Sequence, residues 1–180
     1  MLKKWHVIIR GLRPLIHNKY PLNIEGVISK VRKGTVFDPE QQAKDCLYTN
    51  TKGVIYQPAE HIEGAMIKGA TQVKYKGKKS YKDIVAQNLI VQPREIKLPQ
   101  EYRIDITTGV IPATRGRITI ARPAWDEWTL EFDVIDTSAY QDINTGILKN
   151  IIEEAGKVGI GTFRLKYGKF EVVSVEEIVK

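Results

Sequence analysis

Between the last predicted helix and the last predicted strand, the sequence reads Gly159-Ile160-Gly161-Thr162-Phe163-Arg164-Leu165-Lys166-Tyr167-Gly168. Glycines lack a side chain, so their backbone N–H groups can approach phosphate oxygens closely. Arg164 and Lys166 add positive charge, and Phe163 and Tyr167 offer ring faces on which bases can stack. The segment therefore predicts a nucleic-acid contact at its three glycines and these four side chains. The alternative is a glycine-bearing turn whose aromatic rings pack in the core.

The segments around this stretch show strand and helix patterns in a recognisable order. Apolar residues recur every second position in the two central strand patterns and every three to four positions in the helix patterns, and β-branched residues mark the first strand. In chain order the predicted elements are strand Lys4–Leu12, helix Pro58–Val73, strands Arg117–Ala121 and Trp128–Ile135, helix Ile143–Ala155 and strand Phe170–Val175. The two central strands are expected to pair through a turn at 122–127. This order predicts an α+β, ferredoxin-like βαββαβ core, as in RNA-recognition modules, with a long segment between the first helix and the second strand.

Local signals refine these boundaries. Asp38 before Pro39 predicts the N-terminus of a short helix that runs to about Leu47. Gly156 is expected to end the helix Ile143–Ala155. Gly64 and Gly69 weaken helix Pro58–Val73, which predicts close packing of that helix against a sheet. The stretch 89–96 is a further strand candidate, interrupted by a proline.

Length and composition limit the class of protein. The chain has 180 residues with 42% hydrophobic content, so we expect one domain, 1–180, with an inserted basic region at about 74–116. The net charge of +7 favours polyanionic partners. Cys46 is the single cysteine, so no internal disulfide forms. Because no stretch has the length or pattern of a membrane span or signal peptide, we expect a soluble cytoplasmic protein, of a cell or of a phage host, without a membrane partner.

Three motifs resemble the repeat-associated mysterious protein (RAMP) superfamily, which includes Cas7-type backbone proteins and Cas6-type nucleases of CRISPR systems. The glycine-rich segment is similar to the superfamily's signature, with six residues rather than about five between Gly161 and Gly168. Gly11–Leu15 resembles the Gly-x-x-Pro-Leu opening. Pro58 with Ile62–Ala65 resembles the start of the first helix, with Glu63 in place of the usual lysine. The layout is also similar to a family of uncharacterised, mostly phage-encoded proteins, so the sequence leaves CRISPR and phage pathways open.

Two further basic groups are candidate contacts. Lys74, Lys76, Lys78 and Lys79 precede Lys82 and alternate with two tyrosines, which suits a surface that follows a phosphate backbone, or a solvated loop. A second group surrounds the central strands and consists of Arg103, Arg115, Arg117 and Arg122. The resemblance implies that residues near 111–116 act as a thumb over a bound strand, as inserted hairpins do in Cas7-type proteins. The alternative is that these arginines pair with Glu127, Glu131 and Asp133.

Catalytic and metal chemistry find little support in the sequence. Of the histidines His6, His17 and His61, only His17 is placed where a general acid or base of a Cas6-like ribonuclease could act. No pair of cysteines or histidines has metal-ligand spacing, and no phosphate-binding loop of the nucleotide hydrolases is present, so no metal or cofactor is expected.

We therefore expect a non-catalytic protein that binds single-stranded nucleic acid, RNA or DNA, and possible homo-oligomers that assemble along the strand. The sequence also leaves two alternatives open. One is a metal-independent endoribonuclease that uses His17. The other is an oligomer-forming phage component with no nucleic-acid role.

Overall fold

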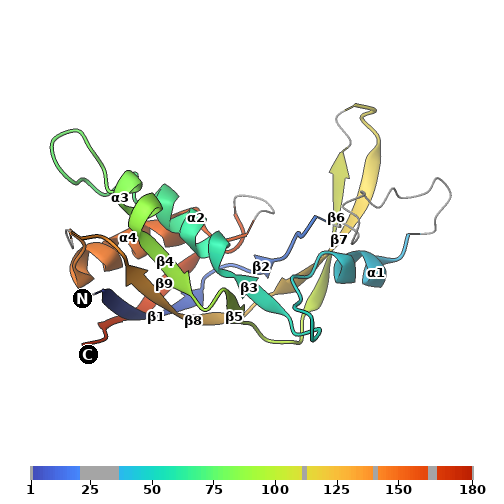
Figure 1. Cartoon of the computed structure of the whole chain (residues 1–180). Coiled ribbons are helices and arrows are strands. Elements are labelled where there is room, and N and C mark those ends of the chain that lie inside the picture. Colours follow the sequence, from blue (N-terminus) through green and yellow to red (C-terminus); the bar gives the residue numbers. More distant parts are fainter. Residues whose placement is uncertain (1, 21–36, 111–112, 140–141, 162–165, 180) are drawn as a thin grey trace.

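The computed structural model describes residues 2–20, 37–110, 113–139, 142–161 and 166–179. Its central element is a four-stranded antiparallel sheet with the strand order β4-β8-β1-β9 (Figure 1). The core elements are β1 (Lys3–Gly11), α2 (Ala59–Gly69), β4 (Leu89–Gln92), β8 (Thr129–Asp136), α4 (Thr145–Val158) and β9 (Phe170–Glu177). With β4 as the second strand, this is the βαββαβ connection and strand order of a ferredoxin-like fold, so the predicted fold class is confirmed.

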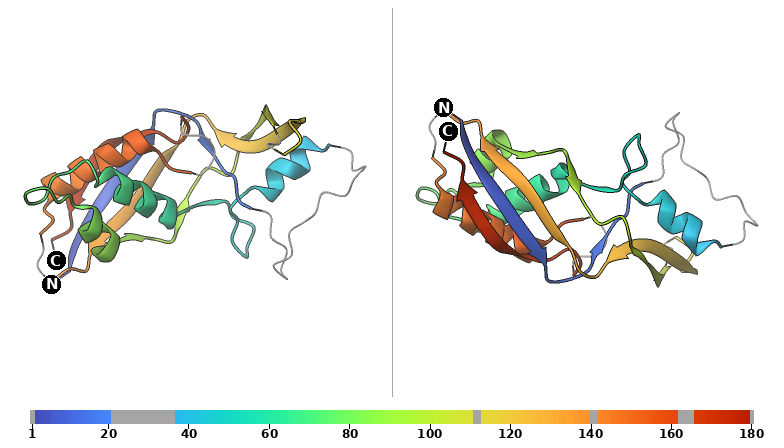
Figure 2. Two further views of the ribbon diagram at one scale, coloured as in Figure 1. Left: turned by 90° about the horizontal axis from the view of Figure 1, so that it is seen from above. Right: turned by 90° about the horizontal axis from the view of Figure 1, so that it is seen from below.

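Helices α2 and α4 cover one face of this sheet, and the other face stays open (Figure 2). Alternation along β1 places Trp5, Val7 and Ile9 against the helices with no exposed surface. The helices also touch each other closely, because a β-carbon on Gly69 would lie 2.4 Å from the backbone nitrogen of Ala155 in α4. Gly69 thus serves helix–helix packing, whereas the sequence suggested packing against a sheet, and Gly64 has no atom close to it.

The second core strand is not the one predicted. The sequence suggested Arg117–Ala121, but the structure uses β4, which follows α2 through the short helix α3 (Lys82–Asn88). The long insertion therefore follows the second core strand instead of preceding it. It contains β5 (Glu95–Lys97), β6 (Arg103–Val110) and β7 (Arg117–Trp125).

The predicted pairing of Arg117–Ala121 with Trp128–Ile135 is wrong. Strand β7 pairs along its length with β6, and its end pairs on the other side with β2 (Leu15–Ile16). Strand β8 is likewise flanked on both edges, by β1 and β4. Since both edges of each strand are occupied, the chain passes from one sheet to the other between them. The β6–β7 hairpin projects away from the core, with α1 (Pro39–Asp45) packed beside it (Figure 1).

The helix starts follow their sequence signals more closely than the helix ends. Asp38 accepts hydrogen bonds from the backbone N–H groups of Glu40 and Gln41, which confirms it as the N-cap of α1. Asn144 caps α4 in the same way. The helix α4 ends at Gly159, with φ of 88°, beyond the predicted Gly156.

The described part of the chain contains neither a membrane-spanning helix nor a cluster of metal ligands. No helix there is long and apolar enough to cross a membrane. No group of three or more histidine, cysteine or acidic residues in that part is arranged to hold a metal ion.

Candidate nucleic-acid interface

The glycine-rich segment forms a tight connection between α4 and β9. Residues 162–165, which include the candidates Phe163 and Arg164, lie outside the described residues. Gly159, Gly161 and Gly168 have φ of 88°, 93° and 65°, a region that side chains disfavour. The backbone N–H of the buried Ile160 donates to the carbonyl oxygen of Gly168 at 2.9 Å, which draws the two ends of the segment together.

The Gly11–Leu15 motif packs directly against this segment. The N–H of Gly168 donates to the carbonyl oxygen of Pro14 at 2.8 Å, and the N–H groups of Leu12 and Arg13 both donate to Lys169. The Gly11–Leu15 motif is also held from the side of β8, because the indole N–H of Trp128 donates to the carbonyl oxygen of Arg13 at 2.9 Å. Two motifs from opposite ends of the chain therefore form one backbone-rich surface.

The charged candidates divide by position. Lys166 is exposed on the glycine-rich segment, next to the half-buried Tyr167. Arg115 and Arg117 are exposed near the end of the β6–β7 hairpin, and the structure gives neither an ion pair with a described residue. Of the three glycines only Gly161 is exposed, because Gly168 is buried and the N–H groups of Gly159 and Gly168 donate to carbonyl oxygens within the protein. We refer to Gly161 and Lys166 on the segment, and Arg115 and Arg117 on the hairpin, as the glycine–arginine surface.

The other two arginines of the hairpin are engaged within the protein. Arg103 forms ion pairs with Asp126 at 2.6 Å and Asp105 at 2.7 Å, and these carboxylates raise its pKa. Arg122 donates to the side chain of Asn18 at 2.6 Å. Arg103 thus pairs with Asp105 and Asp126, and not with the expected Glu127, Glu131 or Asp133, among the residues that the structure describes.

The lysine-rich stretch lies at the opposite end of the molecule from the β6–β7 hairpin (Figure 1). It forms a small hairpin, in which Tyr75 donates its N–H to Lys79 and a bridge joins Lys74 to Ser80. The rings of Tyr75 and Tyr81 lie 5.0 Å apart, edge to face, and the Tyr75 hydroxyl donates to Asp142. These rings are therefore held by internal contacts, while Lys78 and Lys79 remain exposed.

His17 belongs to a buried network. It is 1% exposed, and its Nε2 lies 3.1 Å from Oε1 of Gln57, which is itself 0% exposed. The N–H of Tyr48 donates to Nδ1 of His17 at 3.4 Å, so Nε2 carries the proton and donates to Gln57. The amide nitrogen of Gln57 in turn donates to Nδ1 of His61 at 2.9 Å. Burial lowers the pKa of His17 to about 4, so the ring is neutral at pH 7 and both nitrogens are engaged.

Glu63 has a structural role that explains why no lysine stands at this position. Its carboxylate accepts a hydrogen bond from the backbone N–H of Val91 at 2.9 Å. Val91 belongs to β4, the edge strand of the core sheet, so Glu63 fastens α2 to that strand. A lysine has no acceptor and could not make this bond.

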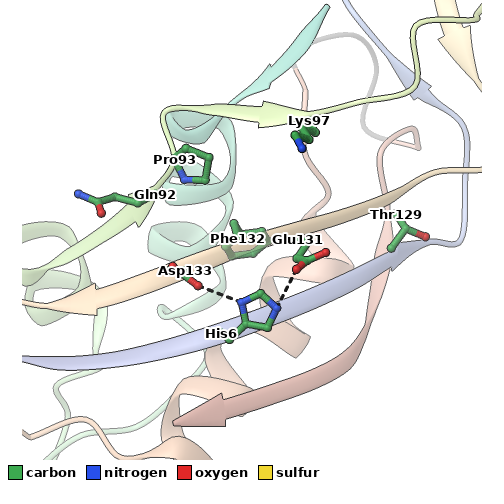
Figure 3. Close-up of a pocket in the computed structure, with 8 residues that line it drawn as sticks. All are labelled: His6, Gln92, Pro93, Lys97, Thr129, Glu131, Phe132 and Asp133. Atoms are coloured by element: carbon green, nitrogen blue, oxygen red, sulfur yellow. Dashed lines mark hydrogen bonds and ion pairs between the residues drawn. The ribbon is translucent and has the colours of Figure 1, made fainter. Parts of the chain in front are cut away.

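The open face of the core sheet differs from that of RNA-recognition modules, which stack bases on aromatic side chains. The register places residues paired across the strands on one face, and no described Phe, Tyr or Trp of these strands is among those that point outward. A shallow cavity of about 590 Å³ on this side is lined in part by His6, Glu131 and Asp133 (Figure 3). Its carboxylates are paired with Lys4 and His6. Because this face offers no Phe, Tyr or Trp for stacking in its described strands, we do not place nucleic acid here.

His6 gives this face a pH dependence that can be tested. Its hydrogen bond to Asp133, at 2.9 Å, raises the pKa of His6. The stability that the imidazolium contributes is therefore fully present below pH 6.5, the ordinary pKa, and is lost as pH rises through the folded pKa. We expect His6→Gln to be less stable than wild type by at most about 1 kcal/mol near pH 5, because the pair is partly solvated, and equal to it near pH 9. Urea unfolding across this range measures the difference, and a difference that grows with pH would contradict the assignment.

Comparisons with known proteins show the fold. No family model and no curated protein matches the sequence. A chain in the cryo-EM structure of the type III-B Cmr-beta complex bound to cognate target RNA aligns over 98% of this chain and 61% of its own length, with a TM-score of 0.57 and 14% identity. A CRISPR protein from Archaeoglobus fulgidus aligns over 99% of this chain and 65% of its own, with a TM-score of 0.43 and 13% identity. The chain thus spans less than two thirds of either neighbour, and it shares its fold with the Cmr-beta chain.

Proposed function

We propose that the chain binds single-stranded nucleic acid without cutting it, through the glycine–arginine surface. The observation that carries this proposal is the contact between the glycine-rich segment and the Gly11–Leu15 motif, beside the exposed Lys166. The exposed cations of this surface suit recognition of a phosphate backbone, and such contacts position a strand without reading its sequence. The net charge of +7 supports the same partner class through long-range attraction.

RNA is the first ligand to test, because the similar Cmr-beta chain belongs to a complex bound to target RNA. Side-by-side assembly along the strand, as in Cas7-type backbones, is part of the proposal. We do not extend the proposal to a nuclease that uses His17, because a neutral ring with 1% exposure and two engaged nitrogens cannot reach a scissile phosphate.

Charge removal at two places tests the location of the interface. The first variant combines Lys166→Ala, Arg115→Ala and Arg117→Ala, and the second combines Lys74→Ala, Lys78→Ala and Lys79→Ala. Both lose three positive charges, so they weaken the long-range field equally. We expect the first to lose about ten- to hundredfold in affinity for single-stranded RNA, and the second less than about threefold.

Fluorescence anisotropy with labelled RNA in EDTA measures these affinities. Equal losses in the two variants would contradict the location of the interface. Cleavage of the RNA by the wild-type protein during the titration would contradict the non-catalytic part of the proposal.

A further inference from the structure

A short turn between α1 and α2 brings two tyrosines together. The backbone N–H of Tyr56 donates to the carbonyl oxygen of Tyr48 at 3.0 Å. The side chain of Asn50 closes the turn by accepting from the N–H groups of Lys52 and Val54, each at 3.0 Å. The rings of Tyr48 and Tyr56 consequently lie with their centroids 6.4 Å apart on a fixed backbone.

His61, in the first turn of α2, adds a third ring. Its centroid lies 5.1 Å from that of Tyr48, with the two planes at 86°. Because Gln57 donates to Nδ1 of His61, the proton of the neutral imidazole sits on Nε2. The buried His17–Gln57 pair therefore orients His61 so that Nε2 is a hydrogen-bond donor directed away from the network.

This aromatic cluster, Tyr48, Tyr56 and His61, differs from the aromatic residues of the core. Each indole N–H of the buried tryptophans finds an acceptor inside the protein, as when Trp125 donates to the carbonyl oxygen of Pro99 at 2.9 Å. The three rings of the cluster are only half-buried. The tyrosine hydroxyls and Nε2 of His61 form no hydrogen bond with a described residue, so their polar edges are available to a ligand.

The surroundings of the cluster favour an uncharged ring as its ligand. Glu95 and Glu60 lie close enough to Tyr56 to contribute to its raised pKa, after the larger effect of burial. These carboxylates would repel a phosphate at the same place. A nucleic-acid base carries no charge, stacks on aromatic rings and accepts or donates hydrogen bonds at its edges.

The cluster is connected to Gly161 of the glycine–arginine surface through β2 and His17. A β-carbon on Gly161 would lie 3.3 Å from the carbonyl oxygen of Ile16 in β2. The next residue, His17, contacts the rings of Tyr48 and Trp125, with centroids 5.1 and 4.6 Å away. A strand whose backbone follows the glycine-rich segment can therefore place a base at the cluster.

We propose that Tyr48, Tyr56 and His61 form a site that accepts one unpaired base of the bound strand. The proposal rests on the proposed function, since it needs a single strand on the neighbouring surface. Because the ring of Tyr48 is inclined by 58° to that of Tyr56 and by 86° to that of His61, one tyrosine ring stacks on the base, and Nε2 of His61 donates a hydrogen bond to a base acceptor.

The test compares a base-containing strand with an abasic strand of the same length and charge. Tyr48→Leu removes the central ring, and Tyr56→Leu is a second variant in case the first fails to fold. Tyr20→Leu is the matched control, because Tyr20 is 59% exposed and makes no ring contact in the described part of the chain. We expect Tyr48→Leu to bind the base-containing strand about 5- to 150-fold more weakly, and the abasic strand as wild type does.

Each other outcome overturns a defined claim. The base site would be overturned if Tyr48→Leu and Tyr56→Leu each lost as much affinity for the abasic strand as for the base-containing strand. It would also be overturned if neither variant lost affinity for either strand. Both results would leave the proposed function standing. A similar loss in Tyr20→Leu would also overturn it. Failure of the wild-type protein to bind either strand would overturn the proposed function together with the base site.

Discussion

Replacing Gly168 by alanine should destabilise the protein by about 2–4 kcal/mol, the range of the strongest backbone and packing effects. Gly168 has φ of 65°, which disfavours any side chain. In addition, a β-carbon there would overlap the carbonyl oxygen of Ile160, so the hydrogen bond from Ile160 to Gly168 would be distorted. For a chain of this size, we expect the midpoint of thermal unfolding to fall by about 5–15 °C.

Gly77→Ala is the matched control for this prediction. Gly77 has nearly the same φ, 60°, but no atom lies within 4 Å of the position that its β-carbon would take. Alanine there should lower the free energy of unfolding by about 1 kcal/mol only, because a side chain disfavours this positive φ. Thermal unfolding of both variants measures the difference, and equal losses would contradict the close packing of the glycine-rich segment.

The second large effect is expected for His17→Leu, with a loss of about 2–5 kcal/mol. Leucine keeps most of the buried volume but leaves Oε1 of Gln57 and the N–H of Tyr48 without their partner. Adding Gln57→Leu should restore part of the loss, because an apolar pair needs no hydrogen bond. Chemical unfolding of the two single variants and the double variant measures this coupling, and strictly additive losses would contradict the network.

The pH dependence gives an independent check on His17. Its folded pKa of about 4 lies below the ordinary value of 6.5, so the unfolded chain binds the extra proton first. Stability therefore falls as pH drops from about 6.5 to 4, by about 3 kcal/mol in total. This slope is opposite to that expected for His6, and it should disappear in His17→Leu.

The core elements that were predicted from the sequence are those with strong local patterns. The run of β-branched residues in β1 and the three-to-four spacing of α4 each identified their element. Strand β4 was not recognised as the second core strand, because it has only four residues and ends at Pro93. Strand β7 was predicted as the second core strand instead, because its alternating pattern is longer, but it belongs to a separate sheet with β2 and β6.

The pairing error has a physical cause that local sequence cannot reveal. Two alternating strands joined by a short connection usually form a hairpin. Here the buried Trp125 and Trp128 lie at the connection, and each indole donates to a different loop, at Pro99 and Arg13. These long-range bonds hold the ends of β7 and β8 in different sheets.

The candidate site was predicted only in part. Glycine content pointed to Gly159–Gly168, since a backbone with positive φ needs glycine whatever surrounds it. The aromatic cluster was missed, because Tyr48, Tyr56 and His61 follow no spacing rule and meet only through the Asn50 turn and the network of Gln57. Tyr75 and Tyr81 looked equally suited to stacking in the sequence, but they pack on each other.

The affinity of the wild-type protein for single-stranded RNA as a function of salt tests the central claim most directly. If cations of the glycine–arginine surface neutralise phosphates, the logarithm of the association constant falls linearly with the logarithm of the salt concentration. Each phosphate contact on a single strand contributes a slope of about −0.7, so the variant lacking Lys166, Arg115 and Arg117 should have a slope shallower by about 2. No binding at low salt, or an affinity that does not change with salt, would contradict the account.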